Sequence, residues 1–415
     1  MTTSACSKER ERPNRASRDL ARVDFWTSTE YTGFLAGLIR ELSKCGFEAR
    51  QRYHISEASY RAAKSPGARL FLRFRQYVGY PAQLIAALAW GRVKGSSSSS
   101  SNTPDGVCVV ATNTFYAPLL ATLFHKRVVH LVYDLFPEAM IHSGKWKEGT
   151  VKVRLVRWIT KQTLKRAELN VFLGERLKGY VESIHGDCGP SAVIAVGADQ
   201  SLFSASPKER TKDRGQGTEG RRAEAESVPS ILYCGNFGNM HDSATLFGYW
   251  RALGSFDPTK IPRFEFFCSG PKRAALEAEL QSLPDGLREQ IRLGGGLDPK
   301  AWIETMERAD VALVTMAAGA ETVVMPSKTY SAMMAGQAIL AIAPEDSDLV
   351  DLIKTADCGW WLEPGDVEGL SRAIEVLCWD RELLIEKREN AFRYAHAHLG
   401  QNALAEQWVE ALEEL

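Results

Sequence analysis

The fold is decided by the stretch Glu321-Thr-Val-Val-Met-Pro-Ser-Lys-Thr-Tyr330, which continues as Ser331-Ala-Met-Met-Ala-Gly336. An apolar run from Asp310 to Thr315 precedes it, and a second run, Ala338-Ile-Leu-Ala-Ile-Ala343, follows it. Each run predicts a buried strand. The chain between them predicts a loop and a short helix that begins near Ser327 and stops at the glycine. A strand, a helix and a strand in this order form the repeating unit of a parallel α/β sheet.

The loop between the two strands carries groups that suit an anionic ligand with hydroxyl groups. A helix N-terminus presents unpaired N–H groups and a partial positive charge, which favour a phosphate. Lys328 adds a full positive charge and Glu321 adds an acceptor for hydroxyl groups. An ordinary strand–loop–helix unit with a solvated lysine has the same pattern, so this stretch alone leaves both interpretations open.

The composition describes an ordinary globular chain of two domains. Its 415 residues exceed one typical core, and 45% are apolar and 25% charged. The formal net charge of zero gives no argument for nucleic-acid binding. Eight scattered cysteines, with no C-x-x-C pair, predict free thiols in a reducing compartment and no metal site. Because no long apolar run or secretory signal is present, we expect a cytoplasmic protein whose residues 1–22 form a flexible tail.

Two polar segments divide the chain. Residues 94–105 contain the serine run Ser96–Ser101, and residues 207–228 are rich in Lys, Arg, Glu and Gly, so neither is expected to have regular structure. We therefore expect a first domain over 23–206, a linker over 207–228 and a second domain over 229–380. Residues 381–415 have a helical pattern and are expected to pack back on the first domain.

Both domains show short β-branched runs that alternate with amphipathic stretches, which predicts parallel sheets. In the first domain the expected strands are Arg22–Trp26, Gly106–Ala111, Arg127–Asp134, Leu169–Leu173 and Ala192–Val196. In the second they are Ser230–Cys234, Phe264–Cys268, Ile291–Leu293, Val311–Thr315 and Ala338–Ala343.

Several motifs resemble those of the retaining glycosyltransferases of family 4. The pattern E-x4-P-S-K-x-Y-x4-A-G, from Glu321 to Gly336, is similar to the donor-binding signature of that family. The turn Gly235-Asn-Phe-Gly-Asn-Met-His-Asp242 resembles the one that opens its second domain, and Cys358–Asp366 resembles a late structural turn in which Asp366 caps a helix. The resemblance implies the GT-B fold, in which two doubly wound, Rossmann-like α/β domains face each other across a cleft.

The same resemblance implies a nucleotide-sugar donor on the second domain. The implied binding residues are Gly33, Gly235, Asn236, Gly238, His241, Ser327, Lys328 and Ser331. Lys328 and the turn would stabilise the departing diphosphate, with Glu321 as a further catalytic group and with no metal or other cofactor. Retention would follow from attack on the same face, assisted by the leaving phosphate and without a protein nucleophile.

The acceptor is expected on the first domain. The segment Val129-His-Leu-Val-Tyr-Asp-Leu-Phe-Pro-Glu-Ala139 resembles a family strand that ends in D-x-x-P-E, so Asp134 and Glu138 are expected to orient acceptor hydroxyl groups. The alternative is that Asp134 caps the following helix. Tyr133 stands where many family members carry a histidine, and His130 is expected to be a core or edge residue.

One departure in the donor motif keeps other functions open. Ser331 stands where the family places a second carboxylate, five residues before the helix-ending glycine, so this departure leaves altered donor choice and lost activity open. The alternatives are a non-catalytic glycosyltransferase-like partner subunit, a nucleotide-sugar 2-epimerase and an α/β binding protein.

A basic segment with aromatic residues follows the acceptor motif. Ten Lys and Arg residues lie between Lys145 and Lys178, interleaved with Trp146 and Trp158. Such a helix suits the surface of an anionic membrane, and equally suits one solvated face of a domain helix. The expected partners are therefore a nucleotide sugar and a glycan or polyprenyl-diphosphate-linked acceptor, with peripheral contact at the inner face of a membrane and no nucleic acid.

Overall fold

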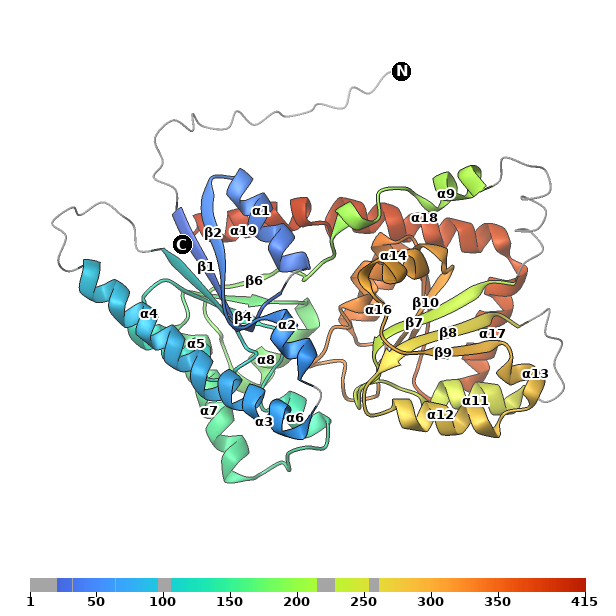
Figure 1. Cartoon of the computed structure of the whole chain (residues 1–415), viewed down its shortest axis with the longest axis horizontal. Coiled ribbons are helices and arrows are strands. Elements are labelled where there is room, and N and C mark those ends of the chain that lie inside the picture. Colours follow the sequence, from blue (N-terminus) through green and yellow to red (C-terminus); the bar gives the residue numbers. More distant parts are fainter. Residues whose placement is uncertain (1–20, 32, 64, 96–105, 215–227, 254–260) are drawn as a thin grey trace, which may run out of the picture.

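The computed structural model consists of two α/β domains joined by a pair of long C-terminal helices (Figure 1). It describes the chain except residues 1–20, 32, 64, 96–105, 215–227 and 254–260. The expected N-terminal tail up to residue 20 and the serine run at 96–101 therefore lie outside the described residues.

The first domain contains a six-stranded parallel sheet of order β2-β1-β3-β4-β5-β6. Its strands are β1 (Ala21–Thr29), β2 (Phe47–Ile55), β3 (Val107–Ala111), β4 (Val128–Val132), β5 (Leu169–Phe172) and β6 (Ser191–Val193). All five predicted strands are confirmed. The edge strand β2 was missed because its sequence, FEARQRYHI, is largely polar, and most of its residues remain half-buried or exposed.

Helices cover both faces of this sheet. They are α1 (Phe34–Lys44), α2 (Glu57–Ala62), α3 (Pro66–Phe74), the π-helical turn η1 (Arg75–Gly79), α4 (Tyr80–Gly95), α5 (Ala117–Phe124), α6 (Glu138–His142), α7 (Val151–Arg166), α8 (Glu175–His185) and the 3-10 turn η2 (Gln200–Leu202). The segments α3, η1 and α4 follow one another without a break and form one long helical rod on the outer side of the domain (Figure 1).

The second domain contains another six-stranded parallel sheet, of order β12-β11-β10-β7-β8-β9. Its strands are β7 (Ser230–Asn236), β8 (Arg263–Ser269), β9 (Ile291–Gly294), β10 (Val311–Thr315), β11 (Ala338–Ile342) and β12 (Gly359–Leu362). The five predicted strands are confirmed, and both sheets have doubly wound orders. Such a sheet binds ligands where the strand order reverses, here between β1 and β3 and between β7 and β10.

Strand β12 corrects the expectation that Cys358–Asp366 is only a turn. Residues Gly359–Leu362 pair with β11, and the turn follows them. Gly359 is needed in this strand because a Cβ there would lie 1.9 Å from the carbonyl oxygen of Ile339. The predicted cap is confirmed, since Asp366 Oδ1 accepts a 2.7 Å hydrogen bond from the backbone N–H of Gly369.

Helices also surround the second sheet. They are α11 (Ala244–Ala252), α12 (Arg273–Ser282), α13 (Asp285–Arg288), α14 (Pro299–Arg308), α15 (Lys328–Met334), α16 (Asp348–Ala356) and α17 (Val367–Trp379). The chain then enters α18 (Arg381–His398), which packs on the second domain, and α19 (Gln401–Glu413), which packs against α1 of the first. Trp408 of α19 meets Phe25 edge-to-face with ring centroids 5.5 Å apart.

The connection between the sheets begins with a helix where we expected a linker without regular structure. Residues Pro207–Arg214 form α9, and residues 215–227 lie outside the described part. A capping box explains its start, because Ser206 N–H donates to Glu209 Oε2 (2.8 Å) and Glu209 N–H donates to Ser206 Oγ (3.3 Å). The S-x-x-E spacing in the sequence predicts this helix start, but the highly charged composition of the segment favoured a linker without regular structure.

Candidate functional site

The turn after β7 leaves open space at the point where the strand order of the second sheet reverses. Gly235 has φ +133°, a backbone conformation that L side chains rarely adopt. A Cβ placed there would meet no described heavy atom within 4 Å. Asn236 and Gly238 follow in the same turn, with the Asn236 side chain exposed. The backbone of this turn can therefore be approached closely by a ligand.

Lys328, the first residue of α15, reaches this turn from a distant part of the chain. Its Nζ donates a 2.6 Å hydrogen bond to Tyr233 Oη and lies 3.8 Å from the centroid of the Tyr233 ring. Tyr233 Oη in turn donates to the carbonyl oxygen of Asn236 (2.9 Å). Burial disfavours the charged ammonium group and lowers the pKa of Lys328 to about 7. An anion bound beside Nζ would restore the favourable charged state.

His241 lies at the other end of the turn and joins β7 to β10. Its Nδ1 is 2.6 Å from the carbonyl oxygen of Thr315, the last residue of β10. Since a carbonyl only accepts, Nδ1 carries the hydrogen and Nε2 is left with its lone pair. Burial and then the neighbouring Lys328 lower the pKa of His241 to about 4, so the ring is neutral at pH 7.

The loop after β10 contains Glu321 and Ser327. The Oε2 atom of Glu321 is shielded from solvent and has no hydrogen-bond partner among the described residues. Ser327 is exposed, and its hydroxyl forms no capping hydrogen bond within the described chain. Helix α15 is only seven residues long. The charge of Lys328 therefore contributes more to an anion site here than the helix N-terminus that the sequence suggested.

Ser331 faces a small cavity beneath Lys328. The cavity measures about 70 Å³ and is otherwise mainly apolar, with Cys234, Trp302 and Gln337 among its lining residues. The Oε1 atom of Gln337 is buried there without a hydrogen-bond partner in the described part of the chain. The smaller serine thus leaves unfilled space at the position where the family pattern has a carboxylate.

Asp134 lies at the carboxyl end of β4 in the first domain. The Thr112 hydroxyl accepts hydrogen bonds from the backbone N–H groups of Tyr133 (3.0 Å) and Asp134 (3.1 Å) and thereby fixes this strand end. The Asp134 side chain is exposed, yet protein surrounds the carboxylate on several sides and the resulting desolvation raises its pKa. The alternative that Asp134 caps a helix is wrong, because α6 begins at Glu138, with Pro137 at its N-cap position.

Glu138 does not stand free for an acceptor as the sequence suggested. Its side chain is 1% exposed, and Oε1 accepts a 2.7 Å hydrogen bond from Arg157 Nε of α7. Arg157 also pairs with Glu148 through two hydrogen bonds of 2.6 and 3.1 Å. The carboxylate of Glu138 therefore holds α6 on α7. His130 is confirmed as a core residue, 2% exposed, with Nδ1 3.0 Å from Asn170 Oδ1.

Gly33 lies at the switch point of the first sheet. It is exposed at the N-cap of α1, and a Cβ there would meet no described heavy atom within 4 Å. Two residues before it, Tyr31 accepts at its Oη a 2.7 Å hydrogen bond from Asn113 Nδ2. Tyr31, Asn113 and Thr112 could not be identified from the sequence as site residues, because none belongs to a motif.

Other contributors to the second-domain cluster were also missed. Tyr233 reads as one more apolar residue of its strand, although its alternation with Gly235 places both on one face. Lys272 donates from Nζ to the carbonyl oxygen of His241, which no spacing rule predicts. The cluster therefore joins Gly235, Asn236, Gly238, His241 and Lys328 as expected and adds Tyr233 and Lys272.

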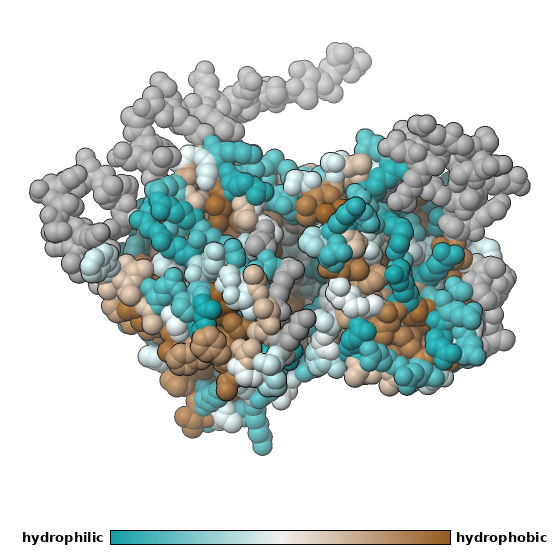
Figure 2. All heavy atoms as spheres, in the orientation of Figure 1, coloured by the Kyte–Doolittle hydropathy of each residue, from teal (hydrophilic) through white to brown (hydrophobic). Residues whose placement is uncertain are grey.

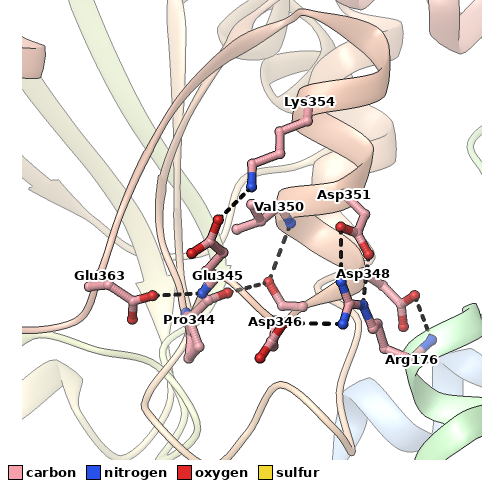
Figure 3. A network of polar contacts seen from close by, with 10 residues as sticks. Arg176, Pro344, Glu345, Asp346, Asp348, Val350, Asp351, Lys354 and Glu363 are labelled. Atoms are coloured by element: carbon pink, nitrogen blue, oxygen red, sulfur yellow. Dashed lines mark hydrogen bonds and ion pairs between the residues drawn. The ribbon is translucent and has the colours of Figure 1, made fainter.

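A polar network joins the two domains where α16 meets α8 (Figure 3). Asp348, at the start of α16, accepts hydrogen bonds from the backbone N–H groups of Arg176 (3.0 Å) and Leu177 (3.3 Å) at the start of α8. Asp348 thus caps a helix of the other domain. The Arg176 guanidinium also pairs with Asp351 (2.8 Å) and Asp346 (3.2 Å).

Replacing Asp348 by alanine is expected to loosen this contact. Loss of the cap should cost about 1 kcal/mol and expose the first N–H groups of α8 to solvent. Hydrogen–deuterium exchange at Arg176 and Leu177 should become faster, with a lower melting temperature. Asp346→Ala is the control, since Asp346 is 85% exposed and such ion pairs contribute little. Unchanged exchange in Asp348→Ala would contradict the capping role.

Two arrangements are absent from the part of the chain that the structure describes. No group of three or more His, Cys, Asp or Glu side chains is arranged to hold a metal ion. No helix in the described ranges combines the length and the hydropathy needed to cross a bilayer.

Comparison with known proteins supports the architecture. No protein-family model matches the chain. A probable glycosyltransferase, WbjE of Pseudomonas aeruginosa, is 23% identical over 264 residues, and the match spans 63% of this chain and 62% of that protein, less than two thirds of its length.

Solved structures match over nearly the whole chain. HepE of Anabaena in complex with UDP has a TM-score of 0.66 at 14% identity, covering 96% of this chain and 100% of its own. Sucrose-phosphate synthase of Thermosynechococcus elongatus has the same score and identity, covering 95% and 98%. WaaG, a glycosyltransferase of lipopolysaccharide biosynthesis, has a score of 0.59 at 14% identity, covering 94% and 98%. The two facing doubly wound domains and these matches establish that the chain has the GT-B fold.

Proposed function

We propose that this chain is a retaining glycosyltransferase that moves a hexose from a nucleotide sugar to a glycan or lipid-linked acceptor. The observation that carries the proposal is the desolvated ammonium group of Lys328, which is linked through Tyr233 Oη to the carbonyl oxygen of Asn236 in the open turn where the strand order reverses. A desolvated cation at such a turn fits a diphosphate. The name of WbjE and the UDP bound to HepE support the same class of ligand.

The donor would lie on the second domain with its diphosphate beside Lys328. Negative charge grows on the leaving phosphate in the transition state, and a cation already in place stabilises it there without reorganisation. The lone pair on His241 Nε2 and the unpartnered Glu321 Oε2 are acceptors suited to sugar hydroxyl groups. A metal ion is not required for this charge stabilisation.

The acceptor would approach from the first domain. Its hydroxyl would attack the face from which the diphosphate leaves, and a phosphate oxygen of the leaving group would take the proton, so that retention needs no protein nucleophile. Asp134 would orient the acceptor hydroxyl, whereas Glu138 is committed to Arg157.

Titration with UDP, GDP, ADP and their sugars, followed by calorimetry, tests this proposal. Binding of one nucleotide family, followed by transfer to an acceptor extract, is the expected result. Absence of binding to every nucleotide would contradict it. The cavity beside Ser331 favours one second candidate, a non-catalytic partner subunit, which would bind nucleotides poorly and co-purify with an active enzyme. Conversion of the sugar without any acceptor would instead indicate a 2-epimerase.

Asp134→Asn is expected to reduce transfer by about 10- to 100-fold while donor affinity stays unchanged, because only acceptor orientation is altered. Calorimetry with UDP-glucose and initial transfer rates would measure the two effects separately. Glu138→Gln is the contrasting variant, since weakening its pair with Arg157 should lower thermal stability more than transfer. Equal transfer by Asp134→Asn and the wild type would exclude Asp134 from the acceptor site.

A further inference from the structure

The outer helical rod of the first domain exposes a row of large apolar side chains. Leu70, Phe71 and Phe74 of α3 are 69%, 61% and 59% exposed, and Val78 of η1 is 51% exposed. Their spacing places them on one side of the helix. Every residue of α3 keeps part of its side chain at the surface. A helix that packed only against its own domain would bury this side.

Helix α7 adds a second row to the same part of the domain. Val151, Leu155 and Trp158 are 81%, 55% and 55% exposed, at spacings of four and three residues. Helix α5 packs against both α4 and α7, so the rod and α7 belong to one side of the sheet. Hydrophobic side chains gather over these helices at the lower left of Figure 2, in the view of Figure 1. We call the exposed surface of α3, η1 and α7 the apolar-basic face.

Positive charge surrounds these apolar side chains. Helix α3 and the turn η1 carry three Arg residues and no Asp or Glu, although the whole chain has a formal net charge of zero. Arg69 and Arg73 lie exposed within the row on α3. Helix α7 carries six Lys and Arg residues and no acidic one. Such a distribution on one face suits a partner that accepts both cations and apolar groups.

We propose that the apolar-basic face docks on an anionic lipid bilayer. Lipid headgroups attract the Lys and Arg side chains, and the acyl boundary accepts Leu70, Phe71 and Phe74, as for an amphipathic helix that lies in the interface plane. A second copy of this chain fits less well, since two such faces would bring like charges together.

The docked face connects to the proposed acceptor site. Gln76 of η1 donates from Nε2 to the carbonyl oxygen of Asn113 (3.1 Å), and the Asn113 side chain donates to Tyr31 Oη at the end of the first sheet. Burial raises the pKa of Tyr31 and that of Tyr77, and the negative charge of Asp134 adds to both shifts. If the proposed function holds, docking would bring this strand end to the level of the headgroups, so the acceptor would be a lipid-linked glycan or its diphosphate carrier.

Vesicle sedimentation without nucleotide or acceptor tests the docking. The full chain should bind vesicles of phosphatidylcholine mixed with phosphatidylglycerol and bind phosphatidylcholine alone much more weakly. The double variants Leu70→Glu/Phe71→Glu and Arg69→Glu/Arg73→Glu should each lose about tenfold or more in affinity. Trp379→Glu is the matched control, because Trp379 is 68% exposed on the second domain and should leave binding unchanged.

Three results would overturn the proposal. The first is unchanged vesicle binding by both double variants, and the second is equal binding to neutral and anionic vesicles. The third is a wild-type oligomer that the Leu70→Glu/Phe71→Glu variant no longer forms, because a second copy of the chain would then cover this face. Circular dichroism and thermal unfolding verify that each variant is folded. Nucleotide binding is measured separately. A chain that binds UDP and does not bind vesicles would contradict the docking proposal alone. A chain that binds vesicles and no nucleotide would contradict the proposed function alone.

Discussion

Lys328→Ala is expected to lower the affinity for UDP-glucose by about 100-fold. The variant loses a charged hydrogen-bond donor whose partner, a diphosphate, would otherwise be held at a partly desolvated site, and such bonds contribute about 1.5–3 kcal/mol. The free protein should not be destabilised, because the ammonium group is disfavoured by burial in the absence of ligand. Loss of affinity together with an unchanged or higher melting temperature is thus the specific signature.

Calorimetry of wild type and variant, with thermal unfolding of both, measures these effects. Lys300→Ala is the matched control, since Lys300 is 88% exposed on α14 and should change neither affinity nor stability. Equal affinity of Lys328→Ala and the wild type for UDP-glucose would contradict the role of Lys328 in diphosphate binding, on which the proposed function depends. A parallel loss of affinity and stability would indicate that Lys328 has a structural role only.

The affinity for UDP-glucose is also expected to fall as the pH rises above about 7. Burial lowers the pKa of Lys328 to about 7 in the free protein, and a bound diphosphate would raise it towards the ordinary value for lysine. Below pH 7 the lysine is already protonated, so affinity stays constant there. Between the free and bound pKa values, binding must take up a proton, and affinity falls by up to tenfold per pH unit.

The diphosphate of UDP-glucose has no ionisation near pH 7, so the protein alone would determine this slope. Titration calorimetry in buffers of different ionisation enthalpy, from pH 6 to pH 9, would measure both the affinity and the proton uptake. Lys328→Arg keeps its charge throughout this range and should show a flat profile. A flat profile for the wild type would mean that Lys328 is not beside the phosphates.

Local patterns predicted most of the secondary structure. The strands β3, β4, β10 and β11 are buried on both faces and consist almost entirely of apolar residues, which the sequence shows directly. The edge strand β2 was missed because its exposure permits polar residues, and α9 was missed because a charged composition was given more weight than its capping box.

The candidate site was predicted in part. The glycine turn and Lys328 belong to motifs, so their residues are identified by the sequence alone. Tyr233 was not, because its hydroxyl becomes a partner of Lys328 only when residues 95 positions apart meet. Glu138 belongs to a motif, and its expected role at the acceptor site is wrong. Its buried pair with Arg157 depends on the packing of α6 on α7, which no spacing in the sequence indicates.

Local patterns in the chain specify the parallel strands, the turn at Gly235, the end of α15 at Gly336 and the two-domain organisation. These features depend on interactions between residues a few positions apart, or on burial that a run of apolar residues reveals. Three other features arise only when the chain is folded: the lowered pKa of Lys328, the capping of α8 by Asp348 172 residues away and the exposure of α3. Desolvation and hydrogen bonding depend on which groups surround an atom, and groups far apart in the sequence become neighbours only in the folded chain.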